Sequence, residues 1–197
     1  MHAPPSVSGG GKLVWDEVLR VTGMEPGQGA VMKIRTEHQN LGAALMQIAE
    51  HDSFTAINPL RIGNAKINNA FLINTDTCLF LKYGQEPKRS THEYQFTFRA
   101  DHVTAIRSAG EVNPKVFIGM MCIEDQEICC IDLQQFNELI AARTQSHGST
   151  EDSYQLLITM PEGRSLRVYT NASGRRGVVA GQEMIVSRSR FPVCLFE

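Results

Sequence analysis

The stretch EYQFTFRADHVTAIRSAGEVNPKVFIGMMCI, residues 93–123, decides the fold because its hydrophobic pattern changes period twice. Residues 93–98 alternate between polar and aromatic side chains, which is typical of a strand with one buried face. Asp101 can cap a helix over 101–110. The continuous apolar run 116–123 predicts a strand that is buried on both faces. A strand, a helix and a buried strand in succession indicate an α+β domain.

Upstream of this stretch, we expect a short helix over 13–22, a brief strand over 30–34, a longer helix over 36–50 and further strands. Residues 36–50 carry apolar side chains at helical spacing, and Thr36 with Gln39 has the spacing of a capping box. Residues 54–69 are rich in Asn and contain a Pro and a Gly, so they predict an irregular connection with at most one short strand. Residues 70–83, AFLINTDTCLFLKY, predict two strands or one long bent strand.

Downstream, the pattern predicts another helix and a C-terminal hairpin. Asp132 and Gln135 have capping-box spacing at the start of the helix. Strands are expected at 128–131, 154–160, 165–170 and 184–187. The predicted fold class is therefore α+β, a mixed β-sheet with an αβββαβ-like core flanked by helices, plus a C-terminal β-hairpin.

Length and composition predict how the chain is divided. The 197 residues fit one domain. The first residues, MHAPPSVSGGG, are mostly Pro, Ser and Gly, so we expect a disordered segment over 1–12 and a single α+β domain over 13–197. An apolar run near 18 residues, which a membrane-spanning helix would need, is missing from the sequence. We therefore expect no membrane partner.

The five cysteines predict a reducing, cytoplasmic location. Cys78, Cys122, Cys129 and Cys130 lie inside apolar runs, where a free thiol behaves as a small hydrophobic group. No CxxC pair is present, and adjacent cysteines on a strand point to opposite faces, which argues against a zinc site. We expect these thiols to pack in the core.

The charge is unevenly distributed along the chain. Residues 164–197 contain six arginines and two glutamates, a charge of +4, and because the net charge is −2 the other 163 residues carry −6. The planar guanidinium group suits bidentate contacts with phosphate, and the turn NASGRR at 171–176 is the expected anion contact. The alternative is a solvated hairpin with outward-facing arginines. The predicted nucleic-acid-binding residues are Arg164, Arg167, Arg175, Arg176, Arg188 and Arg190.

The order of elements in the middle of the chain resembles the core of the restriction-endonuclease-like, or PD-(D/E)XK, nuclease superfamily. That resemblance implies an acidic residue near the start of the second strand and an acid-x-Lys motif on the third, which together hold Mg²⁺. Asp76 and Glu93 match the two metal-binding carboxylates, whereas Gln95 stands where the family has lysine. The resemblance therefore implies Mg²⁺ at Asp76 and Glu93, with Lys82 or Lys66 as the assisting cation.

Strand geometry opposes this site. In a simple antiparallel hairpin between 76–83 and 93–98, Tyr83 would face Glu93, and Asp76 would lie about 23 Å along the ladder. Two carboxylates at that separation cannot share one ion unless the chain bends or bulges. The same hairpin would place Lys82 beside Glu93 as a cross-strand ion pair.

Two functional hypotheses follow. The first is a nucleic-acid-associated protein with a nuclease-like fold that contacts DNA or RNA through its C-terminal arginines, and that cleaves with a divalent metal only if its two acids meet. The alternative is a non-enzymatic interaction protein or accessory subunit, in which the sheet faces a protein partner or a second copy of the chain. Salt-dependent binding of nucleic acid would separate the two hypotheses.

Overall fold

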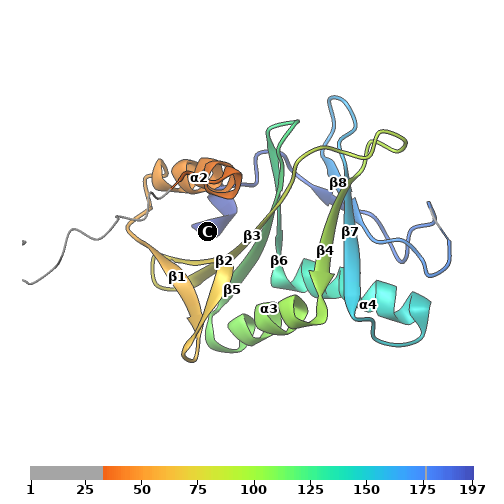
Figure 1. The fold of residues 1–197 in the computed structure, drawn as a ribbon, viewed down its shortest axis with the longest axis horizontal. Helices are drawn as coiled ribbons and strands as arrows, with labels where there is room; N and C mark the ends of the chain where they lie inside the picture. The colour runs from red at the N-terminus through yellow and green to blue at the C-terminus, as the bar shows by residue number, and fades with distance from the viewer. Residues whose placement is uncertain (1–32, 176) are drawn as a thin grey trace, which may run out of the picture. The chain divides into compact units, whose positions relative to one another are not determined.

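The computed structural model describes residues 33–175 and 177–197, and Arg35–Glu197 forms one compact unit (Figure 1). The segment 1–12, predicted to be disordered, lies outside the described residues, as do the predicted start of the domain at residue 13, the predicted helix over 13–22 and most of the predicted strand over 30–34. The described part contains helices and two sheets, one mixed and one antiparallel. The predicted α+β class with a mixed sheet is confirmed.

The larger sheet has five strands in the order β1-β2-β3-β5-β6. Within the described residues, β3 and β5 are its one parallel pair, because the chain leaves the sheet after β3 and returns through a helix. The other neighbours are antiparallel. The strands are β1 (Ile57–Ile62), β2 (Ala65–Ile73), β3 (Thr77–Gly84), β5 (Lys115–Cys122) and β6 (Glu127–Asp132).

The smaller sheet is antiparallel and has the order β4-β7-β8-β9. It contains the predicted C-terminal hairpin as β7 and β8. Helix α3 leads from β4 into the larger sheet, and α4 leads from the larger sheet to β7. The elements are β4 (Tyr94–Arg99), α3 (Ala100–Val112), α4 (Leu133–His147), β7 (Ser153–Thr159), β8 (Leu166–Tyr169) and β9 (Met184–Val186).

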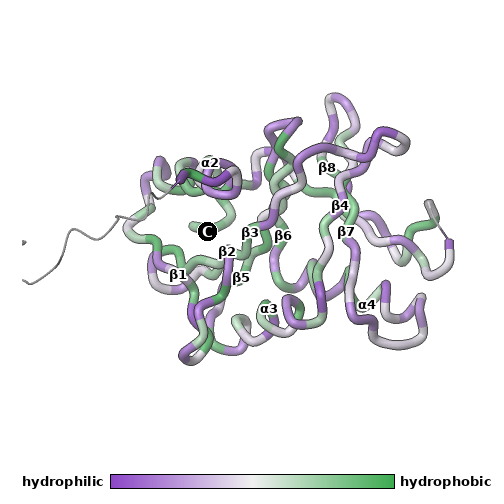
Figure 2. Tube along the Cα trace, in the orientation of Figure 1, coloured by the Kyte–Doolittle hydropathy of each residue, from purple (hydrophilic) through white to green (hydrophobic). Residues whose placement is uncertain are grey.

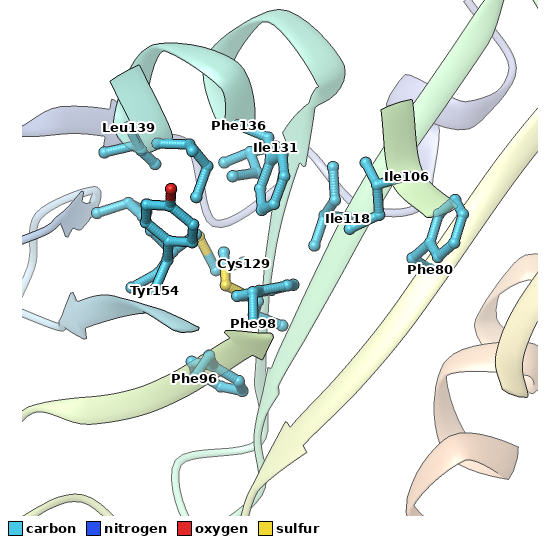
Figure 3. Close-up of a cluster of buried hydrophobic side chains, with 14 of the residues drawn as sticks. Phe80, Phe96, Phe98, Ile106, Ile118, Cys129, Ile131, Phe136, Leu139 and Tyr154 are labelled. Carbon is cyan, nitrogen blue, oxygen red and sulfur yellow. The ribbon is translucent and has the colours of Figure 1, made fainter. Parts of the chain in front are cut away.

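The main hydrophobic core lies where the two sheets meet α3 and α4. Figure 3 shows aromatic and aliphatic side chains from both sheets and from the helices converging there. The rings of Phe98 and Phe136 meet edge to face with centroids 5.1 Å apart. Each such large side chain, when fully buried, contributes roughly 1.5–3 kcal/mol of hydrophobic stabilisation. This core fixes the orientation of the smaller sheet, whose opposite face is left to carry polar groups.

A second hydrophobic cluster covers the other face of the larger sheet. It joins α2 (Thr36–Ala49) to the C-terminal segment, which ends in the short 3₁₀ helix η1 (Val193–Leu195) (Figure 1). The hydroxyl of Thr77, at the start of β3, donates a hydrogen bond to the carbonyl of Leu195 at 3.2 Å. The C-terminus is therefore part of the packed structure.

Two strand predictions were wrong. Residues 54–69, predicted to be mostly irregular, contain β1 and the first half of β2, which pair around a turn at Gly63. Gly63 has a φ of +58°, a conformation that favours glycine. Strand β4 does not pair with β3 in the predicted hairpin, because its partner is β7, about sixty residues downstream. The pairing was missed because periodicity identifies a strand but not its neighbour.

Of the three N-cap residues predicted for the helices, one is correct and two are wrong. Asp132 and Gln135 form the predicted capping box of α4, with the Gln135 amide donating to Asp132 Oδ1 at 2.9 Å. Thr36 and Asp101 are not the caps of α2 and α3, because both helices begin one or two residues earlier, after an arginine. In each case a histidine ring accepts the hydrogen bond of the arginine N–H: His38 at 3.4 Å in α2 and His102 at 3.3 Å in α3.

Candidate nucleic-acid interface

A polar groove of about 540 Å³ opens on the outer face of the smaller sheet. One wall is the turn that follows β3, residues 85–93, which Figure 2 shows to be hydrophilic over most of its length. The other wall is formed by residues 171–175 and Gly177. The residues that line the groove supply cations, amides and hydroxyls. They are Lys88, Ser90, Thr91, Glu93, Gln95, Arg143, Gln155, Asn171, Ala172, Gly174, Arg175 and Gly177.

The first wall is closed by backbone hydrogen bonds. The Lys88 N–H donates to the Glu93 carbonyl at 2.9 Å, and the His92 N–H donates to the Lys88 carbonyl at 2.8 Å. His92 has a φ of +53°, which this tight turn imposes on a residue that is not glycine. The turn presents Lys88 as an exposed side chain at the rim of the groove.

The second wall is anchored to helix α4. Arg143 Nη1 donates to the Asn171 carbonyl at 2.8 Å, and the Ser173 N–H donates to Ser146 Oγ at 2.9 Å. Arg143 also forms a bidentate pair with Glu151, at 2.5 and 2.7 Å. The guanidinium group of Arg143 holds the pKa of Glu151 below its usual range, mainly through these hydrogen bonds. Arg143 is therefore part of the structural support of the groove.

Two groove cations have no acidic partner. Among the described residues, no carboxylate lies within 4.0 Å of the charged nitrogens of Lys88 or Arg175. Both side chains are exposed, and they come from opposite walls of the groove. Cations on opposite walls of one polar groove can both contact an anion whose charge extends over several ångströms.

The floor of the groove is built from neighbouring strands of the sheet. Gln95 Nε2 of β4 donates to Gln155 Oε1 of β7 at 2.9 Å. Glu93 accepts a hydrogen bond from the Tyr169 hydroxyl of β8, and burial together with this bond raises the pKa of that hydroxyl. The Glu93 carboxylate is thus partly satisfied by the protein, and the amide groups remain available to a ligand.

The predicted metal site is not assembled. Asp76 lies at the start of β3, where its carboxylate is 3.7 Å from the Lys115 ammonium at the start of β5. Glu93 lies near the other end of β3. The ring of the next residue, Tyr94, lies beside Gly84, the last residue of β3, and the Tyr94 hydroxyl donates to Asp125 at 2.7 Å. Seven residue steps along β3 separate the two ends, about 23 Å.

The positions of Asp76 and Glu93 do not fit the predicted Mg²⁺ site. Asp76 and Glu93 cannot ligate one ion, and no group of three or more Asp, Glu, His or Cys side chains suited to a metal occurs in the described parts of the chain. The two acids also belong to different sheets, since Glu93 precedes β4. The residues present therefore do not fit the metal centre that the nuclease resemblance implies.

Lys82 does not form the predicted ion pair with Glu93. Its ammonium lies 5.0 Å from the centroid of the Phe98 ring, where the electron-rich ring face attracts a cation. Burial lowers the pKa of Lys82, and the nearby Arg99 lowers it further. Gln95, predicted to stand in the lysine position of the catalytic motif, instead forms part of the groove floor.

The C-terminal arginines divide into different roles. Arg188 pairs with Glu127, and Arg190 pairs with Asp132 at 2.8 Å, so these two attach the chain after β9 to β6. Arg175 lines the groove. Arg164 and Arg167 have no acidic partner within the described residues and lie outside the groove lining, and Arg176 is outside the described residues.

Several groove residues were missed from the sequence. Lys88 belongs to the polar segment 84–91, whose sequence carries no signal for a site, and Gln155 is one polar position of the predicted strand 154–160. The alternation of 93–98 does indicate that Gln95 faces away from the core, so half of the floor was open to prediction. The position of Gln155 beside Gln95 depends on the pairing of β4 with β7, and the local sequence pattern does not reveal which strands pair.

Comparison with protein-family models, with curated proteins and with solved structures finds no match for this chain. The resemblance to the restriction-endonuclease-like superfamily therefore stays a prediction. No helix in the described segments is both long and apolar enough to cross a membrane.

Proposed function

We propose that this protein binds the phosphate backbone of DNA or RNA, without cleaving it, in the groove on the outer face of the smaller sheet. The observation that carries the proposal is that Lys88 and Arg175, on opposite walls of one polar groove, have no acidic partner in the described part of the chain. Phosphate contacts in such complexes come from lysine and arginine together with hydroxyl, amide and backbone N–H groups, which are the groups found in this lining.

The charge of the groove supports an anionic ligand although the whole chain is slightly acidic. Among the described residues of the lining, Lys88 and Arg175 are cations without an acidic partner, Arg143 is paired with Glu151, and the carboxylate of Glu93 accepts a hydrogen bond from Tyr169. A local excess of positive charge attracts a polyanion even when the net charge is −2, because salt screens charges beyond about 8–10 Å. The absence of aromatic residues from this lining favours contact with the backbone over stacking on bases.

The positions of the two acids argue against cleavage by this protein. The two acids suggested by the nuclease resemblance lie at opposite ends of β3, and Asp76 is already paired with Lys115. Without a shared ion, the groove has positioning groups for phosphate but no assembled means of activating water.

The test is a binding measurement with the full chain and fluorescently labelled DNA and RNA oligonucleotides, single- and double-stranded. Lys88→Ala with Arg175→Ala should weaken binding about tenfold, and it should reduce the slope of log K against log salt by roughly 1–2. The matched control is Arg61→Ala with Lys66→Ala, which removes the same charge from the β1–β2 hairpin of the other sheet. The control should bind as the wild type does.

Two outcomes would overturn the proposal. One is an equal loss of affinity in the two double variants, which would mean that net charge alone matters. The other is the absence of binding at low salt, and sedimentation of the chain would then test the alternative of a homodimer or another protein partner. Cleavage of the oligonucleotide with Mg²⁺ or Mn²⁺ present would contradict the non-catalytic part of the proposal.

A further inference from the structure

The C-terminal segment carries a cysteine that meets another cysteine across the core. Cys194 in η1 and Cys130 in β6 are both buried, and their sulfur atoms lie 3.6 Å apart. They lie in the second hydrophobic cluster, between the larger sheet and α2. The other three cysteines are also buried, but none of them has a sulfur hydrogen-bonded to another sulfur in the described residues.

The two thiols are chemically unequal. The hydrogen bond between the two sulfurs lowers the pKa of Cys194, and the nearby Arg190 guanidinium lowers it further, whereas the same pairing and burial raise the pKa of Cys130. Arg190 is held in place by Asp132 and by Gln135, at 2.8 and 2.7 Å. Cys194 is therefore the thiol that ionises more readily, with Cys130 beside it as a second thiol.

We propose that Cys130 and Cys194 form an oxidation site, at which hydrogen peroxide converts the two thiols to a disulfide that ties the C-terminal segment to β6. The geometry carries the proposal, because a sulfur separation of 3.6 Å needs to shorten by only about 1.5 Å to reach bonding distance. Cys194 lies in the short 3₁₀ helix η1, outside the sheet, so the two sulfurs can approach without β6 leaving its pairing with β5.

The chemistry balances in two steps. The Cys194 thiolate attacks one peroxide oxygen, so that an S–O bond forms, the O–O bond breaks, and hydroxide leaves and is protonated to water. The Cys130 sulfur then attacks the Cys194 sulfur. The S–S bond forms, the S–O bond breaks, and the proton of Cys130 leaves with the hydroxide as a second water. The thiol pair loses two electrons and the peroxide gains them.

The disulfide would attach the segment 188–195 covalently to β6 of the larger sheet. Residues 188–195 are held by the ion pairs of Arg188 and Arg190, by the hydrogen bond from Thr77 to Leu195, and by burial of Phe191. A covalent link from 194 to 130 would prevent this segment from detaching when those contacts open. A thiol reductant would reverse the link, as expected for a site that works in a reducing environment.

The experiment treats the full-length reduced protein, under native conditions, with hydrogen peroxide and then maps its cysteines by mass spectrometry. The expected product has lost two hydrogen atoms, has one cross-link between the peptides of Cys130 and Cys194, and melts about 10 °C higher than the reduced protein. Dithiothreitol should restore the original melting temperature. Cys130→Ala should abolish the cross-link. The matched control, Cys129→Ala, changes an equally buried neighbour on the opposite face of β6 and should retain the cross-link.

Other products would contradict the proposal. If Cys194 stops at sulfenic or sulfinic acid while Cys130 stays free for alkylation after unfolding, the two sulfurs do not meet. A cross-link that forms only in denaturant, or that joins other cysteines equally often, would overturn it as well. Should either alanine variant fail to fold, the mapping of the wild-type protein still decides the question.

Discussion

Two sets of cations in this molecule look alike in sequence and differ in structure. Arg188 and Arg190 lie against β6, where each forms an ion pair that holds the chain after β9. Lys88 and Arg175 project from turns into an open groove, where no described carboxylate neutralises them. A guanidinium group whose hydrogen bonds are already used contributes to stability, whereas one that faces solvent beside amides and hydroxyls is available to a ligand. The number of arginines does not reveal this difference.

Among these cations, replacing the paired Arg190 should change the free energy of unfolding most. Arg190→Ala leaves Asp132 without a cation and removes a donor to Gln135, so the free energy of unfolding should fall by about 2 kcal/mol. This figure is below that of a fully buried pair because the Asp132 side chain is 37% exposed and therefore screened by water. Urea unfolding would measure the change.

Arg164→Ala is the matched control for that measurement. Arg164 lies in the same basic segment, is exposed, and contributes only its backbone carbonyl to the contact with Arg188, so its replacement should change stability by less than about 0.5 kcal/mol. Equal losses in the two variants would erase the distinction between the two sets of cations.

An intermediate effect is expected at Arg143, which lines the groove but is paired with Glu151. Since the pKa of Glu151 is lowered in the folded protein, the pair stabilises the fold above the ordinary glutamate pKa, and this stabilisation is lost as pH falls through the lowered value. Glu151→Gln should therefore be less stable than the wild type near about pH 7, and the two should converge once the pH has fallen below the lowered pKa of Glu151. Urea midpoints across this range would show it.

The exposed Glu138 on the outer side of α4 provides the control, because no described cation pairs with it. Glu138→Gln should follow the wild-type pH profile. If the urea midpoints of Glu151→Gln and the wild type differed by the same amount at every pH, the ion pair would not contribute to the pH dependence of stability. Arg143 would then count among the cations that are available to a ligand.

The order of strands and helices could be predicted from the sequence where the hydrophobic period is strong. Residues 93–98 became β4, 101–110 became α3 and 116–123 became β5, each within about two residues. The Asp132 cap was also predicted, because a carboxylate and an amide three residues apart satisfy the free N–H groups of a helix start. These features depend on neighbours in the chain, which a local pattern records.

The groove could not be predicted in the same way. Gln95 meets Gln155 because β4 pairs with β7, and Glu93 meets Tyr169 because β8 follows in the same sheet. The predicted ion pair between Lys82 and Glu93 was wrong for the same reason, since it assumed that β4 pairs with β3. Charges in sequence carry even less positional information, and the partner of Arg190 lies 58 residues away in the chain.

The smallest predicted effect is also the one that best separates binding from catalysis. Glu93 is the one carboxylate in the lining of the groove, so Glu93→Gln removes a negative charge while keeping the size of the side chain and an acceptor for the Tyr169 hydroxyl. Because a phosphate backbone is repelled by that charge, the variant should bind nucleic acid two- to threefold more tightly, roughly 0.5 kcal/mol. A metal-binding role for Glu93 predicts the opposite: weaker binding in the presence of Mg²⁺ and no change in its absence. Titrations with and without the ion, at one salt concentration, distinguish the two roles.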